Sequence, residues 1–251
     1  MSDAYLQGIL AREAVDTGPH APVRGVLTTL TPLIAGWAGN KLLSVSPSGS
    51  FAKGTANHSG TDIDLFISLS EETTETLQQI YEKLFDRLTA LGYAPKRQNV
   101  SINIKVNGYD VDLVPAKRQN ALSNDHSLYR RRAGTWTKTN VQTHIAHVRA
   151  AGHRQETRLI KLWRNQKNLD FPSFYLELAV IEALRNTNYA TLSDRVAACF
   201  RYLRDTFSNA RFVDPANTNN VISDDLTAAE KQRISTAAGQ ALNSTWDQVI
   251  R

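Results

Sequence analysis

Short runs of alternating apolar and polar residues, typical of half-buried β-strands, fill much of the first half of the chain. Asn107-Gly108 separates two of these runs, and this dipeptide favours a tight turn between antiparallel strands. Pro115 follows the second run and is expected to stop it. We therefore predict a small mixed sheet with strands at residues 42–45, 63–69, 101–106 and 109–114.

Apolar residues at helical spacing dominate the remaining segments. Residues 6–37 are mainly helical in pattern, with an interruption around Thr17-Gly18-Pro19 and a second one left open at Pro32. Residues 72–91 form an amphipathic helix pattern that ends at Gly92. No clear strand pattern follows Pro115, and we predict helices at residues 143–150, 156–165, 174–185, 193–207 and 225–249, the last broken at Gly239.

This order of elements predicts an α+β fold with two parts. We expect a sheet-bearing domain at residues 1–116, which includes the N-terminal helices, and a helical domain at residues 117–251. Ligands tend to bind in clefts between such parts, so we place the ligand site there.

Composition is that of a folded protein, with 251 residues of which 41% are hydrophobic and 21% charged. Cys199 is the single cysteine, so an internal disulfide is excluded and we expect this thiol to pack in a core. The N-terminus lacks the pattern of a signal peptide, and no apolar run is long enough to cross a bilayer. We therefore expect a cytoplasmic protein that does not engage membranes.

The net charge of +5 is compatible with polyanionic ligands such as NTPs or RNA. Arg130-Arg131-Arg132 is the densest basic cluster. It could grip nucleic acid, although a run of like charges is usually a solvated surface.

A glycine-serine pair precedes two aspartates, with eleven residues between Ser50 and Asp62. At Gly49 the backbone can approach phosphate oxygens closely, because glycine has no side chain. Asp62 and Asp64 are two residues apart on a predicted strand, so their carboxylates share one face. Asp112 on the hairpin could add a third carboxylate. Three converging carboxylates suit two Mg²⁺ ions, which Mn²⁺ could replace, in the geometry of in-line displacement at phosphorus.

Each of these features also has a simpler explanation. An Asp-x-Asp pair is common, and Asp62 could cap a turn after Ser59-Gly60-Thr61. A Gly-Ser dipeptide carries little information alone, and Asp110 competes with Asp112 for the third position. The spacing by itself leaves the catalytic and the structural explanation open.

A resemblance to a known superfamily adds to these observations. Gly49-Ser50, the spacer and Asp62-Ile63-Asp64 resemble the signature of the polymerase-β-like nucleotidyltransferases, and residues 111–115 resemble the strand that bears the third carboxylate of that family. This favours Asp112 over Asp110. Residues 49–55 are similar to the archaeal CCA-adding enzymes, the oligoadenylate synthetases and the bacterial cGAS/DncV-like signal synthases. The likeness extends from about residue 25 to the end, through residues 136–140 with His144, 158–163, 173–178, 212–215 and 219–221.

The resemblance implies roles for further residues. Ser50 would contact the β- or γ-phosphate, and His144, Lys161 and Tyr175 match positions that hold the triphosphate in the CCA-adding enzymes. Lys53 would lie near the phosphates or the acceptor strand, or only on the surface. Without the resemblance, ordinary packing or solvation is the better explanation for His144, Lys161 and Tyr175.

The resemblance implies transfer of NMP from an NTP, with ATP among the substrates, to a hydroxyl acceptor. Synthesis of a nucleotide second messenger of the antiviral-defence type is the leading expectation. Nucleotide addition to RNA 3′ ends, transfer to a small molecule or protein, and a non-catalytic NTP-binding module are the alternatives. The CCA-adding enzymes carry further domains and this chain ends at Arg251, so we expect no autonomous CCA addition. RNA as acceptor or activator and a protein partner stay open.

Overall fold

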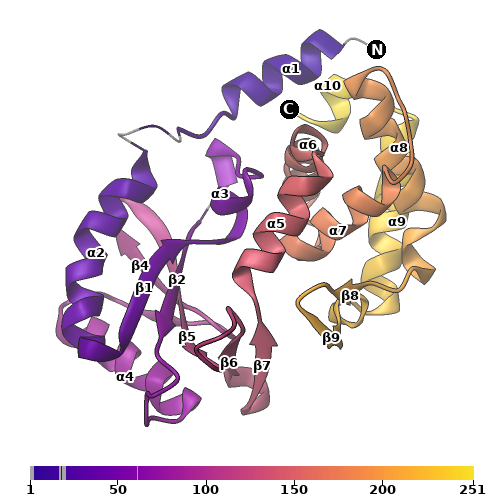
Figure 1. The fold of residues 1–251 in the computed structure, drawn as a ribbon. Coiled ribbons are helices and arrows are strands. Elements are labelled where there is room, and N and C mark those ends of the chain that lie inside the picture. Colours follow the sequence, from indigo (N-terminus) through magenta and orange to yellow (C-terminus); the bar gives the residue numbers. More distant parts are fainter. Residues whose placement is uncertain (1–2, 17, 19–20, 61) are drawn as a thin grey trace. The chain divides into compact units, whose positions relative to one another are not determined.

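The computed structural model describes residues 3–16, 18, 21–60 and 62–251 (Figure 1). These residues form two compact units, and each has its own hydrophobic core. The sheet unit comprises the described residues within 16–52 and 62–145. The helical unit comprises those within 3–15, 53–60 and 146–251.

Seven strands of the described residues form one sheet: β1 (Leu42–Pro47), β2 (Ile63–Leu69), β3 (Lys96–Arg97), β4 (Ile102–Val106), β5 (Tyr109–Arg118), β6 (His126–Arg130) and β7 (Thr135–Thr139). The main path runs β1-β2-β5-β4-β3. β2 and β5 are parallel, whereas the other pairs are antiparallel, so the sheet is mixed as predicted. β6 pairs with the end of β5, and β7 pairs with β6.

The two faces of this sheet differ because side chains alternate along each strand. On one face, the odd-numbered residues of β2 pack into a core with α2 (Pro22–Ala38) and α4 (Leu77–Ala90). Val111 and Leu113 of β5 belong to the same core. The even-numbered residues of both strands, Asp64 and Asp112 among them, therefore lie on the opposite face from these helices.

The predicted hairpin and the strand at residues 63–69 are confirmed, and Asn107 and Gly108 both have positive φ in the turn. The prediction that Pro115 stops its strand is wrong, because β5 continues to Arg118. Pro115 lies between the stretch of β5 that pairs with β4 and the stretch that pairs with β6. On the edge of β5 that faces β4 and β6, Pro115 has no paired residue, so the N–H that proline lacks is not needed for a ladder hydrogen bond.

The prediction that no strand follows Pro115 is also wrong. β6 and β7 extend the sheet, and β8 (Val213–Asp214) pairs with β9 (Asn217–Val221) in the helical unit. The sheet therefore continues well past residue 116, where we expected the domain boundary.

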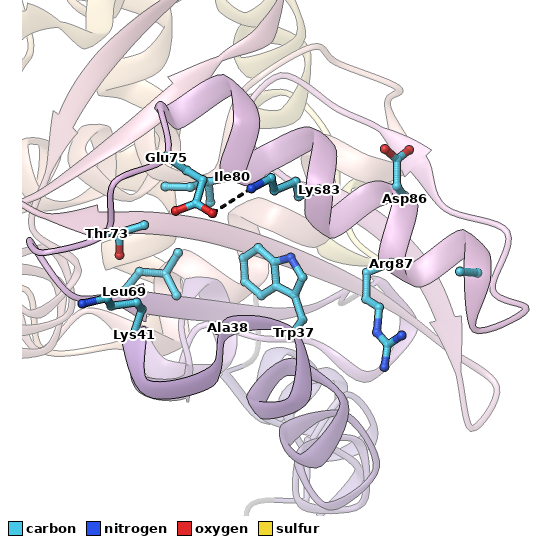
Figure 2. Close-up of a pocket in the computed structure, with 11 residues that line it drawn as sticks. Trp37, Ala38, Lys41, Leu69, Thr73, Glu75, Ile80, Lys83, Asp86 and Arg87 are labelled. Carbon is cyan, nitrogen blue, oxygen red and sulfur yellow. Dashed lines mark hydrogen bonds and ion pairs between the residues drawn. The ribbon is translucent and has the colours of Figure 1, made fainter.

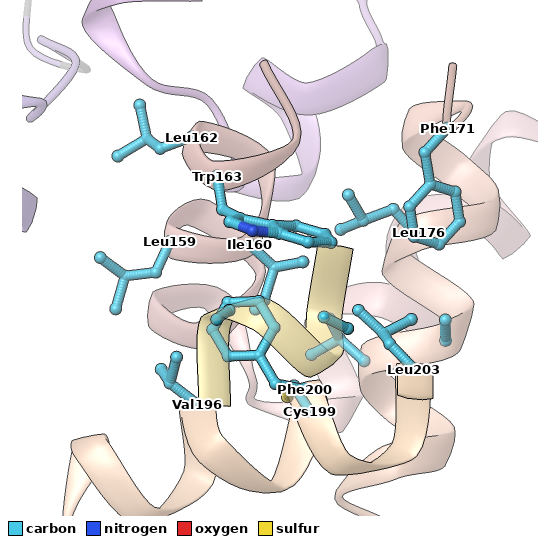
Figure 3. Packing of buried hydrophobic residues seen from close by; sticks show 14 of the residues in the cluster. Leu159, Ile160, Leu162, Trp163, Phe171, Leu176, Val196, Cys199, Phe200 and Leu203 are labelled. Atoms are coloured by element: carbon cyan, nitrogen blue, oxygen red, sulfur yellow. The ribbon is translucent and has the colours of Figure 1, made fainter. Parts of the chain in front are cut away.

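Helices build most of the second unit: α1 (Asp3–Arg12), α6 (Arg154–Gln166), α7 (Ser173–Ala183), α8 (Leu192–Asp205), α9 (Ala228–Leu242) and α10 (Trp246–Val249). α3 (Gly49–Lys53) and α5 (Val141–Ala151) cross from one unit into the other. Trp163 and Phe200 meet edge to face at the centre of the core, with ring centroids 5.0 Å apart (Figure 3). Cys199 is fully buried beside them, as predicted.

α1 packs in the helical unit, although we expected the N-terminal helices to lie with the sheet. The Asp3 carboxylate accepts hydrogen bonds from the backbone N–H groups of Leu192 and Ser193, at 3.0 and 2.8 Å, and so caps α8. The Tyr5 hydroxyl donates to the Ile250 carbonyl at 3.0 Å. These contacts tie the two ends of the chain together.

Two expected helix breaks are absent. α2 continues through Pro32, whose ring faces solvent, so the interruption left open there does not occur. α9 continues through Gly239, and a Cβ at that position would lie 3.5 Å from the Arg204 side chain. The helical region ends at Leu242 instead, and α10 begins after Thr245. The break expected around Thr17-Gly18-Pro19 involves Thr17 and Pro19, which lie outside the described residues.

None of the described helices combines the length and the apolar character that a membrane span requires.

Candidate active site

Asp64 of β2 and Asp112 of β5 occupy paired positions on adjacent parallel strands. Neighbouring strands lie about 4.8 Å apart, so the two side chains leave the sheet side by side. Asp64 is half-buried and Asp112 is buried. Two of the three predicted carboxylates are therefore brought together on the face that α2 and α4 do not cover.

Two amide side chains hold Asp112 in position. Asn103 donates a hydrogen bond to Oδ1 at 2.9 Å, and Gln98 donates to the same oxygen at 3.1 Å. Burial raises the pKa of Asp112 above its usual value, and these donors partly oppose that rise. Asn103 and Gln98 therefore orient the Asp112 carboxylate, but these neutral amides do not balance its negative charge.

Asp110 has a different partner, since it forms an ion pair with Lys105 at 2.9 Å on the exposed part of the hairpin. Asp62 is exposed and directly precedes β2. Partial burial raises the pKa of Asp62, and the charge of Asp112 raises it further. The position opposite Asp64 thus belongs to Asp112, and Asp62 is electrostatically coupled to it. Thr61, part of the alternative turn that Asp62 could cap, lies outside the described residues.

Gly49 lies directly against the Asp64 carboxylate. A Cβ at this glycine would fall 1.8 Å from Asp64 Oδ2, and φ is +54°, a region that favours glycine. The Ser48 N–H donates to the Asp64 carbonyl at 2.8 Å, which fixes the turn to β2. Among the described residues, none forms a hydrogen bond with the Ser50 hydroxyl. The predicted phosphate-binding turn and the predicted metal ligands therefore meet at Gly49.

The donor set fits a hard divalent cation, because all three side chains offer carboxylate oxygens. Mutual repulsion between Asp62 and Asp112 contributes to the raised pKa of Asp62, and a cation would relieve it. Within the described part of the chain, no three acidic, histidine or cysteine side chains are gathered closely enough to hold a metal ion. The backbone places Asp64 and Asp112 side by side, but the carboxylates would have to rotate about their side-chain bonds to bind one metal ion together.

Lys53 and Lys161 belong to a buried cluster in the helical unit. The Glu177 carboxylate accepts from Lys53 Nζ at 2.8 Å, Lys161 Nζ at 2.7 Å and Thr55 Oγ1 at 2.6 Å. Lys161 also donates to Thr55 Oγ1 at 2.9 Å. Burial disfavours the Glu177 charge, but both ammonium groups hold its pKa below the usual value. Burial lowers the pKa of Lys161, and the charge of Glu177 opposes that shift. Phosphate contacts by either lysine remain predictions.

Tyr175 lies in the aromatic core of the helical unit, with no exposed surface. Its ring contacts Phe171, Phe207 and Phe212, and its hydroxyl has no hydrogen-bond partner within the described part of the chain. Burial raises the pKa of this hydroxyl well above its usual value. A contact between Tyr175 and a triphosphate would therefore require the side chain to leave this core.

His144 lies half-buried on α5 within the sheet unit. Its predicted contact with a triphosphate remains a prediction.

Sequence reasoning missed Glu177 and Asn103. Glu177 sits in the apolar stretch of α7, where a lone acid indicates a buried partner of opposite charge. Asn103 is the residue paired with Asp112 across the hairpin, and this register follows from the Asn107-Gly108 turn. Both signals were present in the sequence.

No family model matches the chain. Two known proteins are related to it in sequence. The chain is 28% identical over 202 residues to the cyclic AMP-AMP-AMP synthase of Escherichia coli (strain MS 115-1), which covers 71% of this chain and 63% of that protein. It is 31% identical over 159 residues to the CCA-adding enzyme of Methanosarcina barkeri (strain Fusaro / DSM 804), 58% of this chain and 34% of that protein. The chain thus spans less than two thirds of the first relative and about a third of the second.

Several solved structures match almost the whole chain, among them CdnC and CdnG. CdnC of E. coli MS115-1 with ATP has a TM-score of 0.78 at 22% identity, over 97% of this chain and 91% of that one. CdnG of Bradyrhizobium diazoefficiens in complex with GTP has a TM-score of 0.80 at 15% identity, over 96% and 90%. The chain has the fold of the polymerase-β-like nucleotidyltransferases. Both the α+β class and the resemblance to this superfamily are thereby confirmed.

Proposed function

We propose that the chain is a Mg²⁺-dependent nucleotidyltransferase that transfers NMP from an NTP to a hydroxyl acceptor and releases pyrophosphate. One observation carries this proposal: Asp64 and Asp112 are paired across parallel strands, and Gly49 packs against the Asp64 carboxylate. A phosphate held at the turn would therefore lie next to the acidic residues. A purely structural Asp-x-Asp pair would not need a glycine at this point.

Each residue has a role in this reaction. Asp62, Asp64 and Asp112 would hold two divalent cations, which lower the pKa of the acceptor hydroxyl and offset negative charge on the leaving pyrophosphate. Ser50 would donate a hydrogen bond to a phosphate oxygen, and Gly49 lets the backbone N–H groups approach. The acceptor oxygen forms a bond to the α-phosphorus and loses its proton to solvent, as the bond from the α-phosphorus to the oxygen that bridges the α- and β-phosphates breaks and pyrophosphate leaves with that oxygen.

A second nucleotide is the acceptor we propose, so that the product is a nucleotide second messenger. The support is the 28% identity to a cyclic AMP-AMP-AMP synthase together with the fit to the structures of CdnC and CdnG, which were solved with ATP and GTP. The identity to a CCA-adding enzyme supports addition to RNA 3′ ends as the second candidate. The proposed partners of the chain are RNA, as acceptor or activator, and a protein.

Pyrophosphate release separates an enzyme from a binding module. We expect release from mixed NTPs with Mg²⁺, and its loss in the Asp62→Ala/Asp64→Ala double variant and with EDTA. Asp205→Ala, an exposed acid at the end of α8, is the matched control and should release pyrophosphate normally. The proposal fails if the unmodified chain, with and without RNA, binds NTPs but never releases pyrophosphate.

Product analysis then identifies the acceptor. The chain is incubated with labelled ATP, GTP, CTP and UTP, each with and without total tRNA. Small products that resist nuclease support a second-messenger synthase, whereas label that migrates with tRNA supports RNA 3′-end addition. Label on neither fraction, despite pyrophosphate release, would exclude both acceptors.

A further inference from the structure

A pocket lies in the sheet unit, between the end of α2 and one side of α4 (Figure 2). Its volume is about 490 Å³, within the usual range of small-molecule sites. Leu69 at the end of β2 and Ile80 of α4 contribute buried apolar surface to it. Trp37 contributes the largest aromatic surface, and its side chain is only half-buried.

This pocket is distinct from the candidate active site. Leu69 belongs to the helix-covered face of the sheet, whereas Asp64 and Asp112 lie on the opposite face. Five residues of extended strand also separate Asp64 from Leu69, which is about 17 Å at the usual rise per residue. No residue of the pocket is among the predicted catalytic or NTP-binding residues.

Most charged groups of the pocket are already balanced, since Lys41 forms an ion pair with Glu72 at 3.1 Å. Lys41, Lys83 and Arg87 line it together with two acids, Glu75 and Asp86. Lys83 pairs with Glu75 at 2.7 Å, and Figure 2 shows this ion pair across the pocket from the indole ring. Asp86 points away from the indole in the same view.

Two donors of the pocket, the Arg87 guanidinium and the Thr73 hydroxyl, have no acceptor among the residues that the structure describes. Arg87 lies beside Trp37 in Figure 2, and in the described part of the chain no acid forms an ion pair with its guanidinium. The Thr73 hydroxyl is buried at the other end of the pocket and likewise has no hydrogen-bond partner among the described residues. Buried polar groups are normally paired, so an acceptor supplied by a ligand would complete this one.

We propose that this pocket binds a planar aromatic molecule that carries an anionic group. Its ring would stack on Trp37, and its anionic group would pair with Arg87. A nucleotide and an aromatic carboxylate share this chemistry. Because the pocket adjoins the end of the strand that carries Asp64, its occupant would be an effector, separate from the substrate.

The test uses the full chain and two probes, AMP and indole-3-carboxylate, titrated by isothermal calorimetry. We expect saturable binding of at least one probe, weakened about tenfold or more by Arg87→Gln, since a charge-assisted hydrogen bond has roughly that effect. Trp37→Leu should weaken the same binding. Arg149→Gln, an exposed arginine on α5, is the matched control and should bind normally.

The binding results support or contradict a ligand in this pocket as follows. Tighter binding of AMP that Arg87→Gln weakens identifies a nucleotide ligand of this pocket, and tighter binding of indole-3-carboxylate that Arg87→Gln weakens identifies a non-nucleotide one. If neither probe binds up to millimolar concentration, or if Arg87→Gln binds as the unmodified chain does, the pocket does not take this class of ligand. Arg87 is exposed, so its variant should fold even if Trp37→Leu does not.

Discussion

Gly49→Ala separates a functional glycine from a merely permissive one. The added Cβ would fall 1.8 Å from Asp64 Oδ2, whereas real Cβ atoms essentially never approach another heavy atom within 3.0 Å. The carboxylate would have to retreat by roughly 1 Å, and a displacement of this size costs ~10²-fold in rate. The positive φ at this position adds a backbone cost of about 1–2 kcal/mol.

Gly134→Ala is the matched control for this variant. Gly134 has a φ of +59°, close to the +54° of Gly49, but a Cβ there meets nothing within 4 Å. Gly134→Ala should lose about 1–2 kcal/mol of stability, seen as a fall in Tm of roughly 2–8 °C, and Gly49→Ala should lose at least as much because of the added contact with Asp64. Only Gly49→Ala should lose pyrophosphate release, by ~10²-fold. Equal activity in the two variants would refute the claim that Gly49 positions Asp64.

Three further predictions test the acids and the buried cluster. Asp112→Asn should reduce pyrophosphate release by ~10²–10³-fold while Asp110→Asn keeps most of it, and equal rates in a steady-state assay would contradict the assignment. Glu177→Gln leaves two buried ammonium groups short of charge and should cost about 3–5 kcal/mol in urea unfolding, against at most about 0.5 kcal/mol for Glu72→Gln, whose exposed carboxylate pairs with Lys41. The lowered pKa of Glu177 means that its stabilisation is present above pH 4.5 and is lost as the pH falls through its folded-state value; Glu177→Gln should remove that part of the pH dependence. Asp62 and Asp112 have raised pKa values, so their protonation favours the folded state at low pH, unlike that of Glu177. Mg²⁺ binds the deprotonated carboxylates, so Mg²⁺ affinity should begin to weaken above pH 3.8 as the pH falls.

Strands whose apolar residues alternate strictly were readable from the sequence. β2 places Ile63, Leu65, Ile67 and Leu69, at every second position, in the core with α2 and α4, so its sequence carries a period of two. β6 and β7 lie at the end of the sheet and are only partly buried, so their sequences keep few apolar residues and the pattern disappears. Pairing of β6 with the end of β5, and of β7 with β6, places them in the sheet without an apolar pattern of their own.

Contacts between residues far apart in the sequence also determine the candidate site. Side-chain alternation already placed Asp62 and Asp64 on one face, but the register that sets Asp64 opposite Asp112 depends on long-range pairing of β2 with β5. Likewise, the motif predicted a glycine near phosphate, whereas its contact with the Asp64 carboxylate became visible only in three dimensions. Tyr175 was chosen by position in a motif, and the sequence could not show that its ring is enclosed by three phenylalanines.

Metal and triphosphate positions give the most direct test of the account. A crystal of the chain with MnCl₂ and a non-hydrolysable ATP analogue would locate manganese by its anomalous signal. We expect manganese within about 2.1 Å of carboxylate oxygens of Asp64 and Asp112, and a triphosphate that accepts a hydrogen bond from Ser50. Manganese bound away from these two aspartates, or a triphosphate that does not touch the Gly49-Ser50 turn, would contradict the account.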